Sequence, residues 1–157
     1  MKYDFAIIGS GIIGLTLAFK LKQKFNNSHI IIFEKESNSL SHGSGRNSGV
    51  LHSGIYYEPG SLRAKLCTKG VKELKEYIKS ENLWIDECGK LLLPTSKVSF
   101  LNLNNLYDRA KKNGVKIDKI NNKEIEDLEP NVNCQFDHGL YVPFTSVADP
   151  KEVSNSL

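Results

Sequence analysis

The feature of this sequence that most constrains its fold is a short apolar run that leads directly into a cluster of glycines. Residues 3–8 precede the pattern Gly9-Ser-Gly11-Ile-Ile-Gly14. An apolar helical pattern follows, and a second apolar run then ends on the acid Glu34. This order predicts a strand, a tight turn, a helix and a second strand. In that context a GxGxxG pattern indicates a dinucleotide-binding unit.

Each residue of this pattern has a physical reason to be there. Gly9 allows the sharp turn, Gly11 lets a pyrophosphate approach a backbone without a Cβ, and Gly14 lets the helix pack closely on the strand. The helix then directs unpaired N–H groups and the positive end of its dipole at the phosphates. Glu34, 20 residues after Gly14, is placed to accept hydrogen bonds from an adenosine ribose. The alternative is an ordinary βαβ crossover with incidental glycines.

Length, composition and charge limit the classes of protein to which this chain can belong. The chain has 157 residues, of which 39% are hydrophobic and 25% charged, so we expect a globular fold with a real core. The net charge is +3 and no basic stripe with interleaved aromatics occurs, which argues against a nucleic-acid partner. No apolar run approaches the ~20 residues that span a bilayer, and no signal segment is evident. We therefore expect no transmembrane segment and a cytoplasmic location, with peripheral membrane contact left open.

Cysteine and histidine usage gives no sign of a metal or a disulfide. The three cysteines are far apart and form no CxxC pair, so free thiols are expected. The four histidines lack metal-ligand spacing, and we predict no metal site. These residues are Cys67, Cys88, Cys134, His29, His42, His52 and His138.

The stretch after Glu34 departs from the usual nicotinamide-binding pattern. Residues 37–49, SNSLSHGSGRNSG, are too polar and too rich in glycine for a helix. An NAD-binding unit would usually continue into a helix here, which counts against an NAD-dependent enzyme. A flexible linker is one interpretation. Arg46 and Asn47 among small residues favour the other, a loop that lies along a cofactor phosphate or ring.

The rest of the chain shows local signals for further elements. We predict helices over 62–80 with Ser61 as cap, over 98–113 with a stop at Asn113-Gly114, and over 122–128. A last helix starts at Pro150 with Asp149 as cap. Gly70 indicates a kink or a close packing contact in the first of these. Short strands are expected at 84–89 and 90–94 around a turn, and at 115–120 and 139–144.

Taken together, the motifs resemble those of the FAD-dependent oxidoreductases of the D-amino-acid-oxidase class. The sequence is most similar there to the L-2-hydroxyglutarate oxidase/dehydrogenase family. The resemblance covers nearly all of the chain, and its most specific part is the middle motif. The matching segments are YDFAIIGSGIIGLTLA, IIIFEKE, GSGRNSGVLHSGIYYEPGSLRAKLC, ECGKLLLPTS, and the NGV and EP segments.

The resemblance implies an α/β fold: a Rossmann-like FAD-binding βαβ unit with the start of an α+β substrate domain. Residues 1–80 would be the N-terminal part of the FAD-binding domain and residues 81–148 the start of the substrate domain. Residues 149–157 would begin a helix returning towards the FAD-binding domain. Members of the family are much longer, and their later segments complete the FAD and substrate sites. The chain is therefore expected to be truncated, and a C-terminal half encoded separately is one explanation.

The implied reaction is oxidation of a 2-hydroxy acid, such as L-2-hydroxyglutarate, to the 2-oxo acid by hydride transfer to the flavin. His52 is the candidate base for the hydroxyl proton, and the alternative is a structural histidine beside the flavin. A non-catalytic remnant with weak or no nucleotide binding is the alternative function, and the chain alone is expected to have at best weak activity. The residues implied in cofactor binding are Gly9, Gly11, Gly14, Glu34, Lys35, Ser44, Arg46, Asn47, Ser48 and Gly49.

Overall fold

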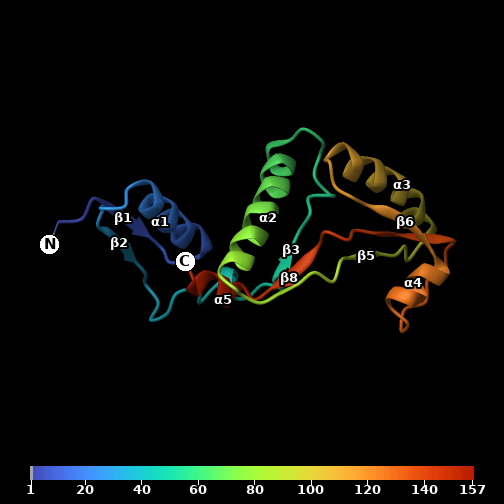
Figure 1. Cartoon of the computed structure of the whole chain (residues 1–157). Coiled ribbons are helices and arrows are strands. Elements are labelled where there is room, and N and C mark those ends of the chain that lie inside the picture. The colour runs from blue at the N-terminus through green and yellow to red at the C-terminus, as the bar shows by residue number, and fades with distance from the viewer. Residues whose placement is uncertain (1) are drawn as a thin grey trace. The chain divides into compact units, whose positions relative to one another are not determined.

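The computed structural model describes residues 2–157, which form two compact units (Figure 1). Unit 1 contains the chain up to Gly49 together with residues 81–84 and 148–157, and unit 2 contains residues 50–80 and 85–147. This division describes packing within the chain. The division into an FAD-binding and a substrate domain, with boundaries at 80 and 148, stays a prediction.

Unit 1 is built on the predicted strand, turn, helix and strand. Strand β1 (Phe5–Ile8) and strand β2 (Ile30–Phe33) pair in parallel, and helix α1 (Ile12–Lys24) connects them and packs on both. The Rossmann-like βαβ prediction is thus confirmed. A short 3-10 turn, η1 (Gly43–Gly45), and helix α5 (Pro150–Asn155) pack against each other in the same unit.

The apolar residues of unit 1 are largely uncovered. The sequence predicted an apolar helical pattern here, and in the structure no residue of α1 is buried. Ile13 is 83% exposed, and at the ends of the two strands Ile8 is 92% and Phe33 54% exposed. The helical pattern was therefore correct, but the described residues supply no layer that covers it.

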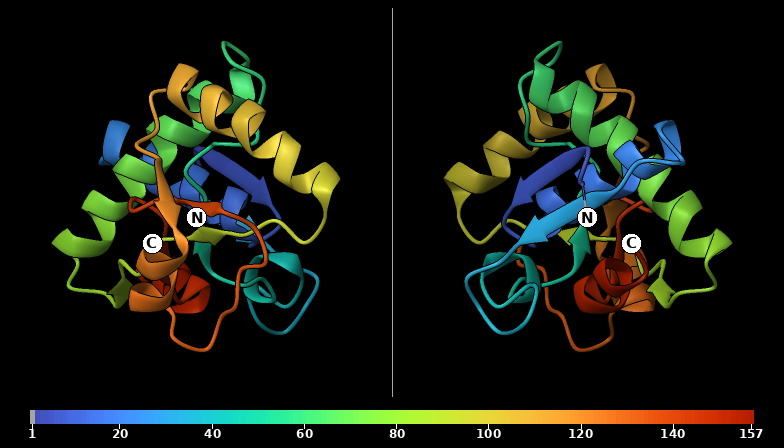
Figure 2. Two further views of the ribbon diagram at one scale, coloured as in Figure 1. Left: turned by 90° about the vertical axis from the view of Figure 1, so that its right-hand side faces the viewer. Right: turned by 90° about the vertical axis from the view of Figure 1, so that its left-hand side faces the viewer.

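Unit 2 contains a three-stranded antiparallel sheet in the order β5-β7-β6. Alternate residues point to opposite faces of such a sheet, so neighbours such as Leu140 and Tyr141 contribute to different apolar clusters. Helix α3 covers one face through Leu103 and Ala110, and helix α4 packs on the other through Ile125 (Figures 1 and 2). These elements are β5 (Leu91–Leu92), α3 (Lys97–Lys112), β6 (Asp118–Asn121), α4 (Asn122–Leu128) and β7 (His138–Tyr141).

A second small sheet has the order β3-β8-β4. Its strands are β3 (Val50–Leu51), β8 (Ser146–Ala148) and β4 (Ile85–Asp86), and helix α2 (Leu62–Ser80) lies between β3 and β4 in the sequence. The expectation that residues 84–94 form two strands around one turn was wrong in its pairing. Strands β4 and β5 both exist, but β5 pairs with β7 and β4 belongs to the other sheet.

The local helix signals were accurate. Helices α2 and α4 have the predicted bounds, and Ser61 Oγ accepts a hydrogen bond from the Ala64 N–H (3.2 Å). Asp149 caps α5, with Pro150 as its first residue. Of the two alternatives for Gly70, a kink or a close packing contact, the close contact is absent, because a Cβ there would meet open space. Within residues 2–157, no helix is long and apolar enough to cross a membrane.

Candidate dinucleotide site

The glycine turn joins β1 to α1 through two tight contacts. Gly9 has φ +97°, a conformation that side chains disfavour, and its N–H donates to the carbonyl oxygen of Phe33 at the end of β2 (2.7 Å). A Cβ on Gly14 would overlap the carbonyl oxygen of Gly9 and lie 3.4 Å from Ile7 Cγ2. The helix therefore packs on the turn at a distance that only glycine permits.

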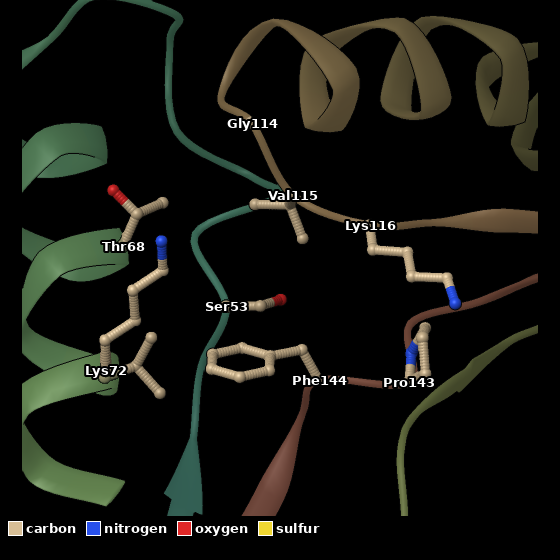
Figure 3. A pocket seen from close by; sticks show the side chains of 9 residues that line it. Ser53, Thr68, Lys72, Gly114, Val115, Lys116, Pro143 and Phe144 are labelled. Atoms are coloured by element: carbon tan, nitrogen blue, oxygen red, sulfur yellow. The ribbon is translucent and has the colours of Figure 1, made fainter. Parts of the chain in front are cut away.

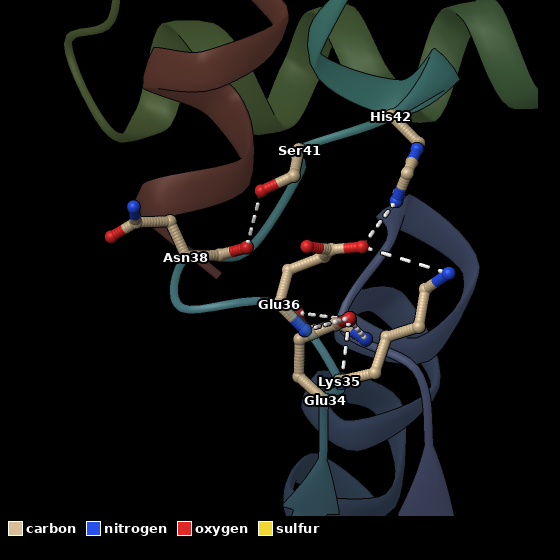
Figure 4. A network of polar contacts seen from close by, with 7 residues as sticks. Glu34, Lys35, Glu36, Asn38, Ser41 and His42 are labelled. Atoms are coloured by element: carbon tan, nitrogen blue, oxygen red, sulfur yellow. Dashed lines mark hydrogen bonds and ion pairs between the residues drawn. The ribbon is translucent and has the colours of Figure 1, made fainter.

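The carboxylate of Glu34 closes the other side of this turn. Its Oε2 accepts hydrogen bonds from the backbone N–H (2.7 Å) and the hydroxyl (2.8 Å) of Ser10, which is buried between the glycines. Its Oε1 accepts from the N–H groups of Lys35 (2.9 Å) and Glu36 (3.1 Å), as Figure 4 shows. These donors, with the Ser10 N–H foremost, lower the pKa of Glu34 from 4.5 to about 2. The acid is thus ionised and held at the carboxyl end of β2.

The N-terminus of α1 meets the loop that follows β2. Gly11 is the N-cap and supplies no side-chain hydrogen bond, and Ser44 Oγ accepts from the Ile12 N–H instead (3.1 Å). A Cβ on Gly11 would lie 3.2 Å from the same oxygen. Ser44 therefore stands at the helix terminus, where an anion is stabilised by the unpaired N–H groups and the dipole.

The loop over residues 37–49 is held by its own hydrogen bonds. The Asn47 side chain donates to the Ser44 carbonyl oxygen (2.9 Å) and accepts from the Gly49 N–H (2.9 Å). Ser41 Oγ donates to the Asn38 carbonyl oxygen (2.7 Å), and His42 Nε2 lies 3.0 Å from Glu36 Oε1 (Figure 4). These contacts give the loop a defined path, which differs from the flexible linker that its composition allowed.

The remaining predicted residues of this loop have different surroundings. Arg46 and Ser48 are exposed, and the side chains of both have no partner among residues 2–157. Lys35 Nζ lies 3.6 Å from Glu36 Oε1. Gly49 has φ +69°, and a Cβ there would overlap the Ala148 carbonyl oxygen. Packing alone thus accounts for the glycine at position 49, and the cofactor contacts of this group stay a prediction.

His52 belongs to unit 2, directly after β3. Its ring is exposed and has no hydrogen-bond partner in the described part of the chain, while its carbonyl oxygen accepts from Cys67 Sγ (3.1 Å). Its catalytic role stays a prediction. The three cysteines are free thiols, as expected. Residues 2–157 contain no group of three or more His, Cys, Asp or Glu side chains that could hold a metal.

The geometry of unit 1 fits the ADP half of a dinucleotide. Gly11 has no Cβ to block a phosphate, α1 points its N-terminus at the same place, and Glu34 follows β2 as an ionised acceptor. The ribose of a dinucleotide would donate hydrogen bonds to the Glu34 carboxylate, which also accepts from Ser10. Its phosphate would replace the Ser44 hydroxyl at the Ile12 N–H or bind beside it. The four predicted residues Gly9, Gly11, Gly14 and Glu34 are brought together, and sequence reasoning missed Ser10.

Comparison with known proteins decides the family. The sequence model of the protein family described as FAD dependent oxidoreductase matches residues 4–157 of this chain. The chain belongs to this family. It is 42% identical over 157 residues to the mitochondrial L-2-hydroxyglutarate dehydrogenase of Dictyostelium discoideum, covering 99% of this chain and 35% of that protein. The L-2-hydroxyglutarate dehydrogenase of Escherichia coli K12 is 36% identical over 155 residues, with coverages of 99% and 36%.

Solved structures agree with this assignment. The L-alpha-glycerophosphate oxidase of Mycoplasma pneumoniae, with FAD bound, superposes with a TM-score of 0.84 at 26% identity, covering 99% of this chain and 41% of that one. Glycine oxidase from Geobacillus kaustophilus has a TM-score of 0.82 at 21% identity, with coverages of 98% and 42%, and shows likeness of fold alone. The chain spans about a third of the length of the curated relatives it matches. FAD is the cofactor of this family.

Proposed function

We propose that this chain is the nucleotide-binding portion of an FAD-dependent oxidoreductase that oxidises a 2-hydroxy acid such as L-2-hydroxyglutarate. One observation carries the proposal: the glycine turn, the start of α1 and the ionised Glu34 converge at one end of a parallel strand pair. The identity of 36–42% to proteins named L-2-hydroxyglutarate dehydrogenase supports the substrate class.

In this proposal the residues of unit 1 hold and orient the cofactor, which supplies the hydride acceptor. Gly9, Gly11 and Gly14 admit the diphosphate to the start of α1, and Glu34 accepts from the ribose hydroxyls. Arg46 brings an unpaired guanidinium to the loop and would neutralise phosphate charge. The other residues proposed to lie along the diphosphate and flavin edge, with side chain or backbone, are Lys35 before the loop and Ser44, Asn47, Ser48 and Gly49 within it.

His52 is the proposed base for the substrate hydroxyl. A neutral imidazole takes up a proton readily near neutral pH, and the exposed ring of His52 has no competing partner among the described residues. Its proton acceptance would accompany loss of the hydride from the carbon that bears the hydroxyl. A cytoplasmic location, which three free cysteines favour, is part of the same proposal.

We further propose that a polypeptide equivalent to the rest of the relatives completes the enzyme, whether encoded separately or in the same chain. The parallel pair β1-β2 supports this, because parallel sheets are normally covered on both faces and have more than two strands. Ile8, Ile13 and Phe33 expose apolar surface that such a polypeptide would cover. The chain alone should then have at best weak activity.

The visible absorption spectrum of the purified chain tests the cofactor assignment. FAD is added in excess, free FAD is removed by gel filtration, and the retained flavin is measured. A Gly11→Val variant should retain less, because its side chain blocks the phosphate approach and presses on Ser44. Gly43→Ala is the control, since a Cβ there meets open space. Equal retention by wild type and Gly11→Val would contradict the proposed site.

The same absorption measurement tests the proposed substrate and the need for a further polypeptide. Anaerobic bleaching of the bound flavin by L-2-hydroxyglutarate, and not by its D enantiomer, would support the substrate. A chain that retains no flavin would then be mixed with the remaining two thirds of a relative. Failure to retain flavin in that mixture as well would favour the alternative, a non-catalytic remnant.

A further inference from the structure

Unit 2 contains a cavity of about 320 Å³, which is large enough for a small organic molecule. Its walls come from α2, from the segment after β3, from the α3-β6 connection and from the β7-β8 connection (Figure 3). Val71, Val115 and Phe144 supply apolar surface. None of the residues proposed for FAD or for substrate chemistry lines this cavity.

The hydroxyl of Ser53 is one of the polar groups that line the cavity. Ser53 is only 4% exposed, and its Oγ has no hydrogen-bond partner in the described part of the chain. Figure 3 shows the hydroxyl directed away from the strand, into the space between Val115 and Phe144. Thr68 differs, because its Oγ1 donates back to the Ala64 carbonyl oxygen (2.9 Å). The buried side-chain atoms without a partner among the described residues lie elsewhere, so the Ser53 hydroxyl is accessible from the cavity, where a ligand can accept its hydrogen bond.

Two lysines bring positive charge to the same cavity. Lys72 reaches it from α2 and Lys116 from the α3-β6 connection, on either side of Ser53 in Figure 3. Neither ammonium group forms an ion pair or hydrogen bond with residues 2–157, although Lys69, Lys75 and Lys79 of α2 all do. None of the described residues that line the cavity is acidic. The charge is therefore available to a ligand.

We propose that this cavity binds a small organic carboxylate with an apolar body. The carboxylate would accept a hydrogen bond from Ser53 Oγ and lie near Lys72 and Lys116, while the apolar body would pack on Val71, Val115 and Phe144. This site shares no residue with the dinucleotide site, and the proposal does not depend on the function proposed above.

An NMR titration of the ¹⁵N-labelled chain with phenylacetate tests the proposal, and phenylacetamide is the neutral control of the same shape. We expect saturable shifts at the amides of residues 53, 68–72, 114–116 and 144. Binding of the amide should be about tenfold weaker, because it loses the attraction of two partly screened lysines. Equal affinity for both compounds, or shifts spread over the exposed apolar residues, would overturn the proposal.

Single substitutions measure how much each polar side chain of the cavity contributes to the affinity for phenylacetate. Ser53→Ala should weaken phenylacetate binding about tenfold, the effect of one hydrogen bond to a charged group. Its melting temperature should not fall, since the Ser53 hydroxyl has no partner to lose. Lys72→Gln and Lys116→Gln should each weaken binding about threefold. Lys65→Gln, an exposed α2 lysine outside the cavity, is the control. Unchanged affinity in a folded Ser53→Ala variant would overturn the assignment.

Discussion

Replacing Gly14 by alanine tests whether the close approach of α1 to the glycine turn is required by the fold. In an open helix this substitution would be favourable by about 1 kcal/mol, because alanine has the higher helix propensity. At Gly14 the new Cβ would overlap the Gly9 carbonyl oxygen and contact Ile7 Cγ2 at 3.4 Å. A backbone oxygen fixed by the turn cannot move aside as a flexible side chain can, so α1 must shift away from β1.

The size of the effect follows from these opposing contributions. Overpacking of this kind typically costs 1–3 kcal/mol, and the shift also disturbs the turn that Gly9 forms. Because the overlap is with a backbone atom we take the upper end of this range, about 3 kcal/mol, and subtract the gain of about 1 kcal/mol from helix propensity. The net loss in the local stability of the βαβ unit is then about 2 kcal/mol, which corresponds to about a 30-fold loss of protection. Gly70→Ala is the matched control, because it is also a helical glycine but a Cβ there meets open space. It should stabilise α2 by about 0.5–1 kcal/mol.

Native-state hydrogen exchange measures both effects in one experiment. The amides of β1 and β2 report on Gly14→Ala, and those of α2 report on Gly70→Ala. The two units need not unfold together, so local exchange is a better measure than a single melting curve. If Gly14→Ala left the protection of β1 and β2 unchanged or raised it, helix propensity would outweigh the contact, and the steric reason for the third glycine would be wrong.

Three further predictions follow from named contacts. Glu34→Gln should destabilise the chain at pH 7, since an amide nitrogen would face the N–H donors of Ser10 or of Lys35 and Glu36. The folded pKa of Glu34 is lowered from 4.5 to about 2, so its contribution is complete above pH 4.5 and is lost as the pH falls towards 2. Urea unfolding should accordingly show a smaller difference between variant and wild type at pH 3 than at pH 7, and a constant difference would contradict this. Ser44→Ala should reduce the exchange protection of the Ile12 amide by about 1 kcal/mol, the usual effect of losing a cap, with Ser48→Ala as the unaffected control. Ile117→Ala, at a fully buried position, should cost about 2–5 kcal/mol in the exchange protection of β7, whereas Leu101→Ala, at a position 72% exposed, should stay within about 0.5 kcal/mol.

Local chemistry made much of this fold predictable. Ser61 before α2 and Asp149-Pro150 before α5 are signals that act within a few residues, and these helices begin where those residues place them. The glycine pattern and Glu34 were likewise sufficient to place the turn and the acid together. Each of these features depends on short-range hydrogen bonds or on backbone conformation, and both are determined by residues close together in the sequence.

Features that depend on distant partners could not be predicted in this way. Leu91 pairs with Tyr141, 50 positions later, and nothing near residue 91 specifies that partner over β4, its neighbour in the sequence. Ser10 was missed because a small polar residue between glycines gives no sign that it will be buried on a carboxylate. The cavity beside Ser53 was missed for the same reason, since its walls come from four separated segments.

Unit 1 contains residues from both ends of the chain, so during synthesis it cannot be completed until the residues after unit 2 have been made. Helix α5 packs on η1, and Ala148 hydrogen-bonds to Gly49 (3.0 Å), so residues that follow unit 2 in the chain complete a unit begun before it. Roughly 100 residues separate these partners, and at about 5–20 residues per second the ribosome needs on the order of 5–20 s to make them. The loop over residues 37–49 must wait that long for α5. During this interval it is open to chaperones and proteases, and slower translation of unit 2 would lengthen the exposure.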